Sequence, residues 1–320
     1  MKNSVIMATY NGEKYITEQL DSIRNQTLPP DEVIICDDCS SDNTRTIINE
    51  YISKYKLTGW QLYSNEKNIG FFDNFFKALR LSTGDVIYLS DQDDVWDKYK
   101  LRTFTIQFEK NSDLMMVQSD FRFIDEDGNL LNKQEHYHGF TNGNFRELTS
   151  FEMCKFAGSG YTMSFRRCVL EKIFDLHLNE KKDIFKFHDI MLGLVAVSEG
   201  ECFLCRNIID KHRIHENNIT KKKNRSYTSG RTKRKQIDIL EKRYQYFNIM
   251  SESTIDSFKR NIFKDFALFS LTRKEVIEKC RISKLLYLIA RRKMYASKVG
   301  VIVDLLYAFG FEKFICFIIG

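Results

Sequence analysis

The first ninety residues alternate short apolar runs with stretches of helical periodicity, and this alternation constrains the fold more than any other feature. Apolar runs with the length of buried strands occupy residues 3–9, 32–36, 61–64 and 85–89. Apolar side chains spaced for one helix face occupy residues 13–26, 42–55 and 74–81. Strands that alternate with helices form parallel βαβ units. We therefore predict an α/β fold with a mostly parallel, Rossmann-like sheet flanked by helices.

Polar residues follow three of these predicted strands directly. Thr9, Tyr10 and Asn11 follow the first strand, Asp37 and Asp38 follow the second, and an acidic cluster from Asp91 to Asp94 follows the strand at 85–89. In open α/β sheets, ligands bind beyond the carboxyl ends of the strands. We therefore expect these polar groups to share one ligand-binding rim.

The acidic cluster consists of Asp91, Asp93 and Asp94, which stand within four residues of one another. Carboxylates this close repel each other, and a cation relieves the repulsion. Oxygen ligands suit Mg²⁺ or Mn²⁺, and Mg²⁺ typically joins one or two carboxylates to substrate phosphates. The sequence thus predicts a site for Mg²⁺ or Mn²⁺; the alternative is a solvated acidic turn.

Four segments together resemble the family 2 glycosyltransferases, which have the GT-A fold. They are SVIMATYNGEKYI, VIICDDCSSDNT, NEKNIGFFDNF and GDVIYLSDQDDVW, in this order and at these spacings. The SDQDDVW string is most similar to bacterial rhamnosyltransferase-type members that build surface polysaccharides. The resemblance is strong over residues 1–110, weaker to about residue 220, and does not extend beyond.

The resemblance implies a role for individual residues of this sequence. Asp189, in Phe187-His188-Asp189, corresponds to the catalytic base; from the residues alone, it could instead cap the apolar helix that follows. The implied metal ligands are Asp93, Asp94 and His215. The implied donor-binding residues are Thr9, Tyr10, Asn11, Asp38, Asn68, Asp91 and Asp93.

These roles imply an inverting transferase with a dTDP- or UDP-sugar donor. It would move a sugar, with rhamnose as one candidate, to a hydroxyl of a surface polysaccharide or a lipid-linked acceptor. One base and no second carboxylate nucleophile favour single displacement. Two alternatives remain: a nucleotidyltransferase, which lacks support from any Gly-rich phosphate loop, and a GT-A-like module that binds nucleotide or glycan without turnover.

The predicted division places a catalytic domain at residues 1–220, with a nucleotide-binding half at 1–110 and an acceptor half at 111–220. A basic linker and a helical region follow at 221–320. The basic stretch from Lys211 to Lys235 suits phosphates or anionic lipid, or is a solvated loop. Its aromatic content is too low to predict nucleic-acid binding.

The apolar helices near the end of the chain have two interpretations. They lie on an anionic membrane surface, or they pack as a helical subdomain on the core or on a second protomer, so homo-oligomer formation is left open. No signal peptide or membrane-spanning run is recognisable. We therefore expect a cytoplasmic protein, with peripheral contact to the inner face of the cell membrane as one option.

Overall fold

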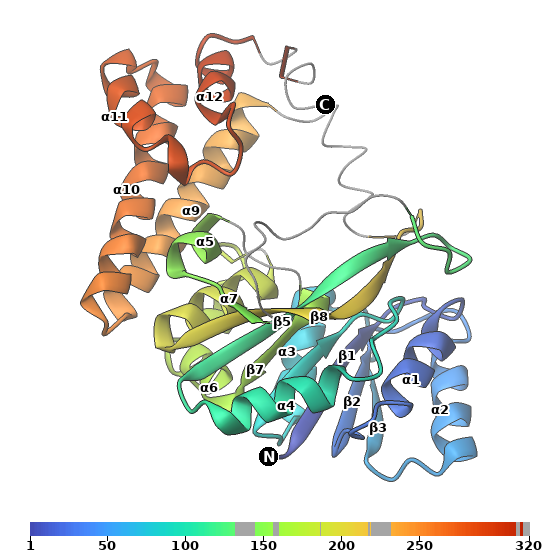
Figure 1. Cartoon of the computed structure of the whole chain (residues 1–320). Coiled ribbons are helices and arrows are strands. Elements are labelled where there is room, and N and C mark those ends of the chain that lie inside the picture. The colour runs from blue at the N-terminus through green and yellow to red at the C-terminus, as the bar shows by residue number, and fades with distance from the viewer. Residues whose placement is uncertain are drawn as a thin grey trace. The chain divides into compact units, whose positions relative to one another are not determined.

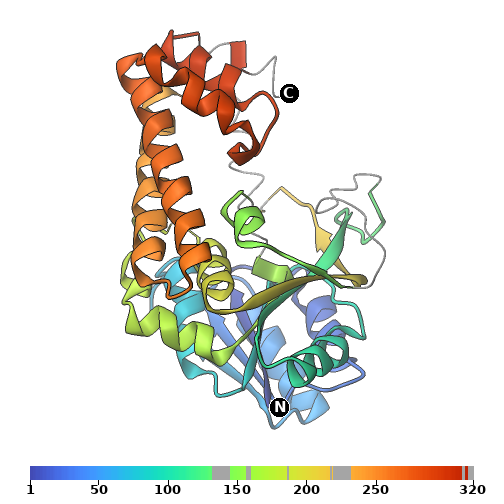
Figure 2. The same ribbon diagram turned by 60° about the vertical axis from the view of Figure 1, so that its left-hand side comes forward.

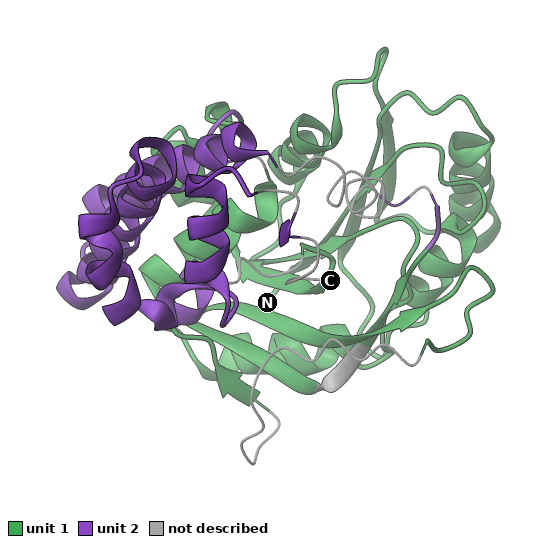
Figure 3. Cartoon of the chain, turned by 90° about the horizontal axis from the view of Figure 1, so that it is seen from above, with its two compact units in different colours: residues 1–149, 158–182, 186–214 green, residues 150–157, 183–185, 215–320 purple. Residues whose placement is uncertain are grey.

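The computed structural model describes residues 1–131, 145–155, 160–185, 187–216, 218, 232–311 and 314–315. Within them the chain divides into two compact units, shown in Figure 3. The first unit comprises residues 1–149, 158–182 and 186–214, and the second comprises residues 150–157, 183–185 and 215–320. The long part of the second unit starts at His215, and the functional division at residue 220 stays a prediction.

The described part of the first unit is built on one sheet of eight strands in the order β3-β2-β1-β4-β7-β5-β8-β6 (Figure 1). Neighbouring strands among β1 to β4 pair in parallel, and so do β5 and β8. Strand β7 pairs antiparallel with both β4 and β5, and β6 pairs antiparallel with β8. The strands are β1 Asn3–Thr9, β2 Glu32–Asp37, β3 Trp60–Ser64, β4 Val86–Ser90, β5 Leu114–Ile124, β6 Phe145–Glu147, β7 Met163–Arg166 and β8 Glu201–Arg213.

Helices cover both faces of this sheet. On one face, α1 (Ile16–Arg24), α2 (Thr44–Tyr55) and α4 (Lys100–Lys110) share a buried core with alternate strand residues such as Val5 and Tyr88. On the other face lie α3 (Phe71–Leu81) and α7 (His188–Glu199), and α6 (Arg167–Asp175) packs on α7. The alternation of side chains along each strand thus divides the apolar residues between two cores.

The second unit is helical. Its long helices α9 (Lys233–Ser253) and α10 (Ser257–Lys279) are joined by a short link and lie side by side, as the orange ribbons of Figure 2 show. The side chains of Thr232 and Asp256 cap the starts of α9 and α10, respectively, by accepting a hydrogen bond from a backbone N–H group of the first turn. The shorter helices are α5 (Ser150–Lys155), α11 (Leu285–Ala290) and α12 (Gly300–Ala308).

The structure confirms the predicted α/β fold with an open, mostly parallel sheet flanked by helices. Helix α3 starts at Phe71, three residues before the predicted start, and β8 continues to Arg213, although its apolar run ends at Cys205. Most of the basic stretch from Lys211 to Lys235 lies outside the described residues. Among the described helices, none is both long enough and apolar enough to cross a membrane.

Candidate active site

The carboxyl ends of β1 and β2 are joined by a buried hydrogen-bond network. Asp37 is fully buried, and its carboxylate accepts from the hydroxyl of Thr9 at 2.9 Å and from the backbone N–H of Ser40 at 2.9 Å. Asn11 continues the network: its backbone N–H donates to the Ser40 hydroxyl and its side-chain oxygen accepts from the Ser41 N–H. Thr9 and Asn11, both predicted to bind the donor, thus hold the rim together.

Asp38 organises the loop that precedes α3. Its carboxylate accepts from the backbone N–H groups of Ile69 and Gly70, both at 2.8 Å, and from the side-chain amide of Asn65 at 2.9 Å. Only 3% of the residue is exposed. A carboxylate held by three N–H donors fixes the backbone of this loop. Asn68, another predicted donor ligand, lies exposed in the same loop and accepts from the Gly70 N–H at 3.2 Å.

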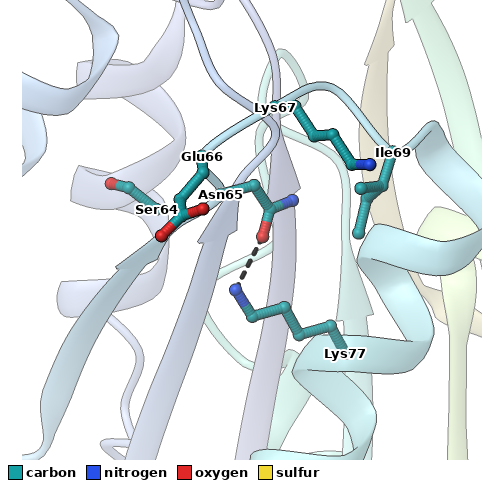
Figure 4. A pocket seen from close by; sticks show the side chains of 6 residues that line it. All are labelled: Ser64, Asn65, Glu66, Lys67, Ile69 and Lys77. Carbon is teal, nitrogen blue, oxygen red and sulfur yellow. Dashed lines mark hydrogen bonds between the residues drawn. The ribbon is translucent and has the colours of Figure 1, made fainter.

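An open pocket of about 660 Å³ lies beside this loop (Figure 4). Lys77 reaches from α3 into it and donates to the side-chain oxygen of Asn65 at 2.6 Å. Since Asn65 also donates to Asp38, the pocket wall and the Asp38 loop are one connected structure. The lining residues are Ser64, Asn65, Glu66, Lys67, Ile69 and Lys77.

Gln92 ties the acidic loop to the loop after β1. Its side-chain oxygen accepts from the backbone N–H of Tyr10 at 2.9 Å, and its side-chain nitrogen donates to the Tyr10 carbonyl at 3.0 Å. A Cβ atom at Gly12 would lie 2.3 Å from that same oxygen, so any side chain there would displace the Gln92 amide from this position. The Tyr10 side chain is 49% exposed. The role of Gln92 was not predicted, because it depends on a contact across 82 positions of sequence.

The acidic cluster is brought together as predicted. Asp91, Asp93 and Asp94 each offer one oxygen, and these oxygens lie within 4.8 Å of one another. The pKa of Asp91 is raised well above its usual range, by burial of its carboxyl group and then by the charges of Asp94 and Asp93. Asp94 Oδ2 is buried and has no hydrogen-bond partner among the described residues. Hard, mutually repelling oxygens with one unsatisfied position fit a divalent cation such as Mg²⁺ or Mn²⁺.

The end of β8 supports the other oxygen of Asp94. His212 Nδ1 donates to Asp94 Oδ1 at 2.8 Å, and the Arg213 backbone N–H donates to it at 3.1 Å. Burial opposes protonation of His212, but the charge of Asp94 and its hydrogen bond prevail and raise the pKa to about 9. The His212 ring stacks on Tyr161 at 4.2 Å. The buried Arg213 guanidinium donates to the Asp93 carbonyl at 3.0 Å, so it fixes the backbone of the cluster.

The imidazole beside the cluster is thus His212, whereas the sequence singled out His215. His215 belongs to the second unit, is buried, and donates its backbone N–H to the side-chain oxygen of Asn218. Its part in metal binding stays a prediction. His212 was not predicted, because it lies at the end of β8, where the polar residues from Asp210 to Arg213 leave no apolar pattern from which a strand can be recognised.

Asp189 lies at the first turn of α7, close enough to the cluster for its charge to raise the pKa of Asp91. Its Oδ1 accepts from the Ile190 N–H at 2.8 Å. Gly160 approaches this turn closely: a Cβ there would lie 3.0 Å from His188 Nε2 and 3.6 Å from the Asp189 Cβ. Helix α7 therefore delivers Asp189 toward the rim that carries the acidic cluster, while the absence of a side chain at Gly160 leaves room for the His188 ring beside it.

His188 is buried beside Asp189, and its ring stacks on Phe75 at 4.2 Å. Neither ring nitrogen has a hydrogen-bond partner among the described residues, and burial lowers the pKa to about 4. The folded protein therefore holds His188 neutral, while the unfolded chain protonates it near pH 6.5. This difference makes the fold less stable as the pH falls from about 6.5 toward 4, by up to roughly 3 kcal/mol.

We expect His188→Phe to remove this acid sensitivity, because phenylalanine preserves the stacking on Phe75 and carries no proton. The measurement is the fall in melting temperature between pH 7 and pH 4.5, which should be smaller in the variant than in the unaltered protein. His177→Asn is the matched control, because the His177 side chain is 73% exposed. Equal falls in all three proteins would contradict the assignment.

Comparison with solved structures identifies the fold. The chain superimposes on residues 1–349 of TarS from Staphylococcus aureus in complex with UDP, with a TM-score of 0.63 and 16% identity, covering 98% of this chain and 89% of that one. It also matches the mannosyltransferase PcManGT from Pyrobaculum calidifontis, in complex with GDP-Man and Mn²⁺, with a TM-score of 0.53 and 15% identity over 96% and 87% of the two chains. These likenesses confirm the predicted GT-A fold.

Sequence comparison gives relatives over the first part of the chain. Poly(ribitol-phosphate) β-N-acetylglucosaminyltransferase TarS of S. aureus is 38% identical over 121 residues, which is 37% of this chain and 21% of TarS. Chondroitin synthase of Escherichia coli is 30% identical over 151 residues, which is 47% of this chain and 21% of the synthase. The chain thus spans about a fifth of the length of these relatives.

The family profile covers more of the chain than these pairwise matches do. Residues 4–174, more than half of the 320 residues, match the glycosyl transferase family 2 profile. This range contains nearly all of β1, then β2 to β4 and the acidic cluster, and it ends before Asp189. With the GT-A fold, the profile match settles the classification: the chain belongs to glycosyl transferase family 2.

Proposed function

We propose that the protein is an inverting glycosyltransferase that moves a sugar from a nucleoside-diphosphate donor to a hydroxyl of a saccharide acceptor. The observation that carries this proposal is the cluster of Asp91, Asp93 and Asp94, whose carboxylate oxygens lie within 4.8 Å of one another and leave Asp94 Oδ2 without a partner among the described residues. Asp189 adds a candidate base, whose charge contributes to the raised pKa of Asp91. A base beside a group of carboxylates that fits a cation is the arrangement that sugar transfer from a diphosphate requires.

In the proposed reaction, Asp189 accepts the proton of the acceptor hydroxyl as its oxygen forms a bond to the anomeric carbon of the donor. The bond from that carbon to the diphosphate breaks, and the nucleoside diphosphate leaves with the bonding electrons. Attack opposite the leaving group inverts the configuration.

Asp93 and Asp94 would hold the divalent cation, with Asp91 in support. A bound Mg²⁺ or Mn²⁺ would offset the charge that develops on the diphosphate. The protein's own part is to hold these carboxylates in place, through His212 and Arg213 at Asp94 and through the Arg213 side chain at the Asp93 carbonyl.

The donor nucleoside would bind beside the Tyr10 and Asp38 loops. Exposed Tyr10 offers an aromatic face for a base, and the pocket next to Asp38 contains the cations Lys67 and Lys77. We propose a UDP- or dTDP-sugar. Rhamnose is suggested by the SDQDDVW string, whereas N-acetylglucosamine is suggested by a solved structure of TarS in complex with UDP-GlcNAc.

The acceptor would be a growing surface polysaccharide or a lipid-linked saccharide, which brings the enzyme to the inner face of the membrane. The rival functions, nucleotide or glycan binding without turnover and nucleotidyl transfer, share the fold but differ in the reaction. Metal- and pH-dependent hydrolysis of the donor sugar separates them. A binding module hydrolyses no donor. A nucleotidyltransferase would break the bond between the two phosphates and release a nucleoside monophosphate and a sugar 1-phosphate, instead of a nucleoside diphosphate and a free sugar.

We expect calorimetry with UDP-, dTDP-, GDP- and CDP-sugars to give Mn²⁺-dependent binding of one UDP- or dTDP-sugar. The expected affinity falls sharply when EDTA removes the metal, because cation and diphosphate bind together. The thermal shift of the same samples reports that the protein is folded. A folded sample that binds none of the donors would contradict the proposed function and favour a module for glycan alone.

A further inference from the structure

Helix α12 in the second unit is apolar on both of its faces. Its inner face is packed, because Val303 and Tyr307 join Leu240 of α9 and Ile277 of α10 in one core. Its outer face carries Ile302, which is 50% exposed, and Phe309 directly after the helix is 52% exposed. These two residues are seven apart, so they lie on one stripe. Packing in the core of the second unit therefore does not explain why the residues of the outer stripe are apolar.

The one charged residue of this fully described helix is withdrawn from the surface. Asp304 is completely buried and accepts from Arg273 Nε at 2.7 Å, from the second Arg273 nitrogen at 2.8 Å and from the Tyr295 hydroxyl at 2.6 Å. Helix α12 thus offers solvent no charged side chain. A helix that is apolar all round is normally covered on every side.

The preceding helical segment repeats the pattern. Ile282, Leu286 and Ile289 follow the spacing i, i+4, i+7 through the turn at Ile282–Lys284 and α11, and Leu286 is 78% exposed. Leu288, on the other side of α11, is fully buried. Two successive helical segments therefore each bury one apolar face and expose another.

Positive charge accompanies these stripes without a matching negative charge. From residue 285 to residue 303 the sequence contains Arg291, Arg292, Lys293 and Lys298 and no aspartate or glutamate. Arg292, Lys293 and Lys298 are exposed, and Arg291 stacks over the Tyr287 ring at 4.0 Å. The partner of this surface must accept both exposed apolar side chains and a cluster of cations.

We propose that this surface, made of the α11 stripe, the α12 stripe and the four cations between them, docks on an anionic phospholipid bilayer. Apolar stripes inserted at the headgroup boundary with cations beside the phosphates satisfy both features. A second copy of the chain fits less well, because a two-fold contact would set the same cations against themselves. Helices of six and nine residues are far shorter than the ~20 residues of a membrane span, so they lie in the interface. The proposal deepens the proposed function, since it gives the enzyme access to a lipid-linked acceptor.

The test is co-sedimentation of the full chain with vesicles of phosphatidylcholine alone or mixed with phosphatidylglycerol. We expect binding to the mixed vesicles only, weakened by salt. Arg291→Gln/Arg292→Gln/Lys293→Gln should weaken it on the order of 100-fold, since each cation near the surface contributes about fivefold. Leu286→Gln/Ile289→Gln should also weaken it. Ile255→Gln/Phe258→Gln is the matched control, because Ile255 in the link between α9 and α10 is 82% exposed and Phe258 in the first turn of α10 is 74% exposed.

Three results would overturn the proposal: no binding to the mixed vesicles, equal loss in the control variant, or a concentration-dependent dimer in light scattering that Leu286→Gln/Ile289→Gln abolishes. The third result would assign the surface to a second copy. Vesicle binding needs no turnover, and donor binding is measured in solution on the same preparations. Failure of the membrane surface is therefore distinguishable from failure of the proposed glycosyl transfer.

Discussion

Asp189→Asn is expected to keep donor binding and to lose sugar transfer by on the order of 10³-fold, within the 10²–10⁴-fold range of general-base catalysis. The amide has the same shape as the carboxylate but takes up no proton. Its oxygen can still accept from the Ile190 N–H, so the first turn of α7 should remain intact. The measurements are kcat for transfer and the calorimetric affinity for the donor that the unaltered protein binds.

Glu199→Gln is the matched control for this variant, because it makes the same chemical change at the other end of α7. Glu199 is partly exposed and pairs with Lys172 at 3.8 Å, so its loss should leave kcat unchanged. Normal transfer by Asp189→Asn would remove Asp189 from the role of base. Equal losses in both variants would point to a damaged helix.

The second large effect is expected at Asp94. In Asp94→Asn, the amide oxygen can still accept from His212 and Arg213, whereas the position of the unpartnered Oδ2 becomes an uncharged N–H₂ group. Loss of one cation ligand should weaken Mn²⁺-dependent nucleotide binding at least about 10–100-fold, the loss typical even of outer partners of a metal. Calorimetry with UDP, with and without Mn²⁺, measures this change.

Asp97→Asn is a suitable control for Asp94→Asn, because Asp97 follows the same loop but lies outside the cluster. Its carboxylate accepts from the Tyr99 N–H at 2.8 Å just before α4, and the amide oxygen of asparagine can do the same. The melting temperatures of both variants should stay close to that of the unaltered protein. If Asp94→Asn kept its full nucleotide affinity with Mn²⁺, Asp94 would be a structural residue that positions His212.

Local sequence patterns predicted the nucleotide-binding half of the fold well. Short apolar runs such as 3–9 match a strand residue for residue, because β1 is buried on both faces and bounded by polar residues. The apolar run at 85–89 likewise predicted β4, and with it the position of the acidic cluster at the end of that strand. In this region each strand and helix buries apolar side chains with a regular spacing, and this spacing leaves a clear periodicity in the sequence.

Features that depend on distant pairing were not predicted. The continuation of β8 to Arg213 follows from its pairing with β5, since Asp210 to Arg213 carry too many polar side chains to resemble a strand. The same holds for Thr9 and Asp38. The resemblance could suggest that both contact a donor, but it could not predict that Thr9 donates to Asp37 or that Asp38 accepts from the 65–70 loop. Register and long-range hydrogen bonds are properties of the assembled sheet.

The clamp between Gln92 and Tyr10 has a thermodynamic consequence. Because both hydrogen bonds of the Gln92 amide end on the Tyr10 backbone, any displacement of the loop after β1 is transmitted to the residues on either side of Gln92, which are Asp91 and Asp93. A ligand that favours one position of the first loop therefore favours one arrangement of the carboxylates, and reciprocity requires that a cation bound there changes the affinity for that ligand by the same factor. Nucleotide discrimination in this protein would then vary with the ion supplied.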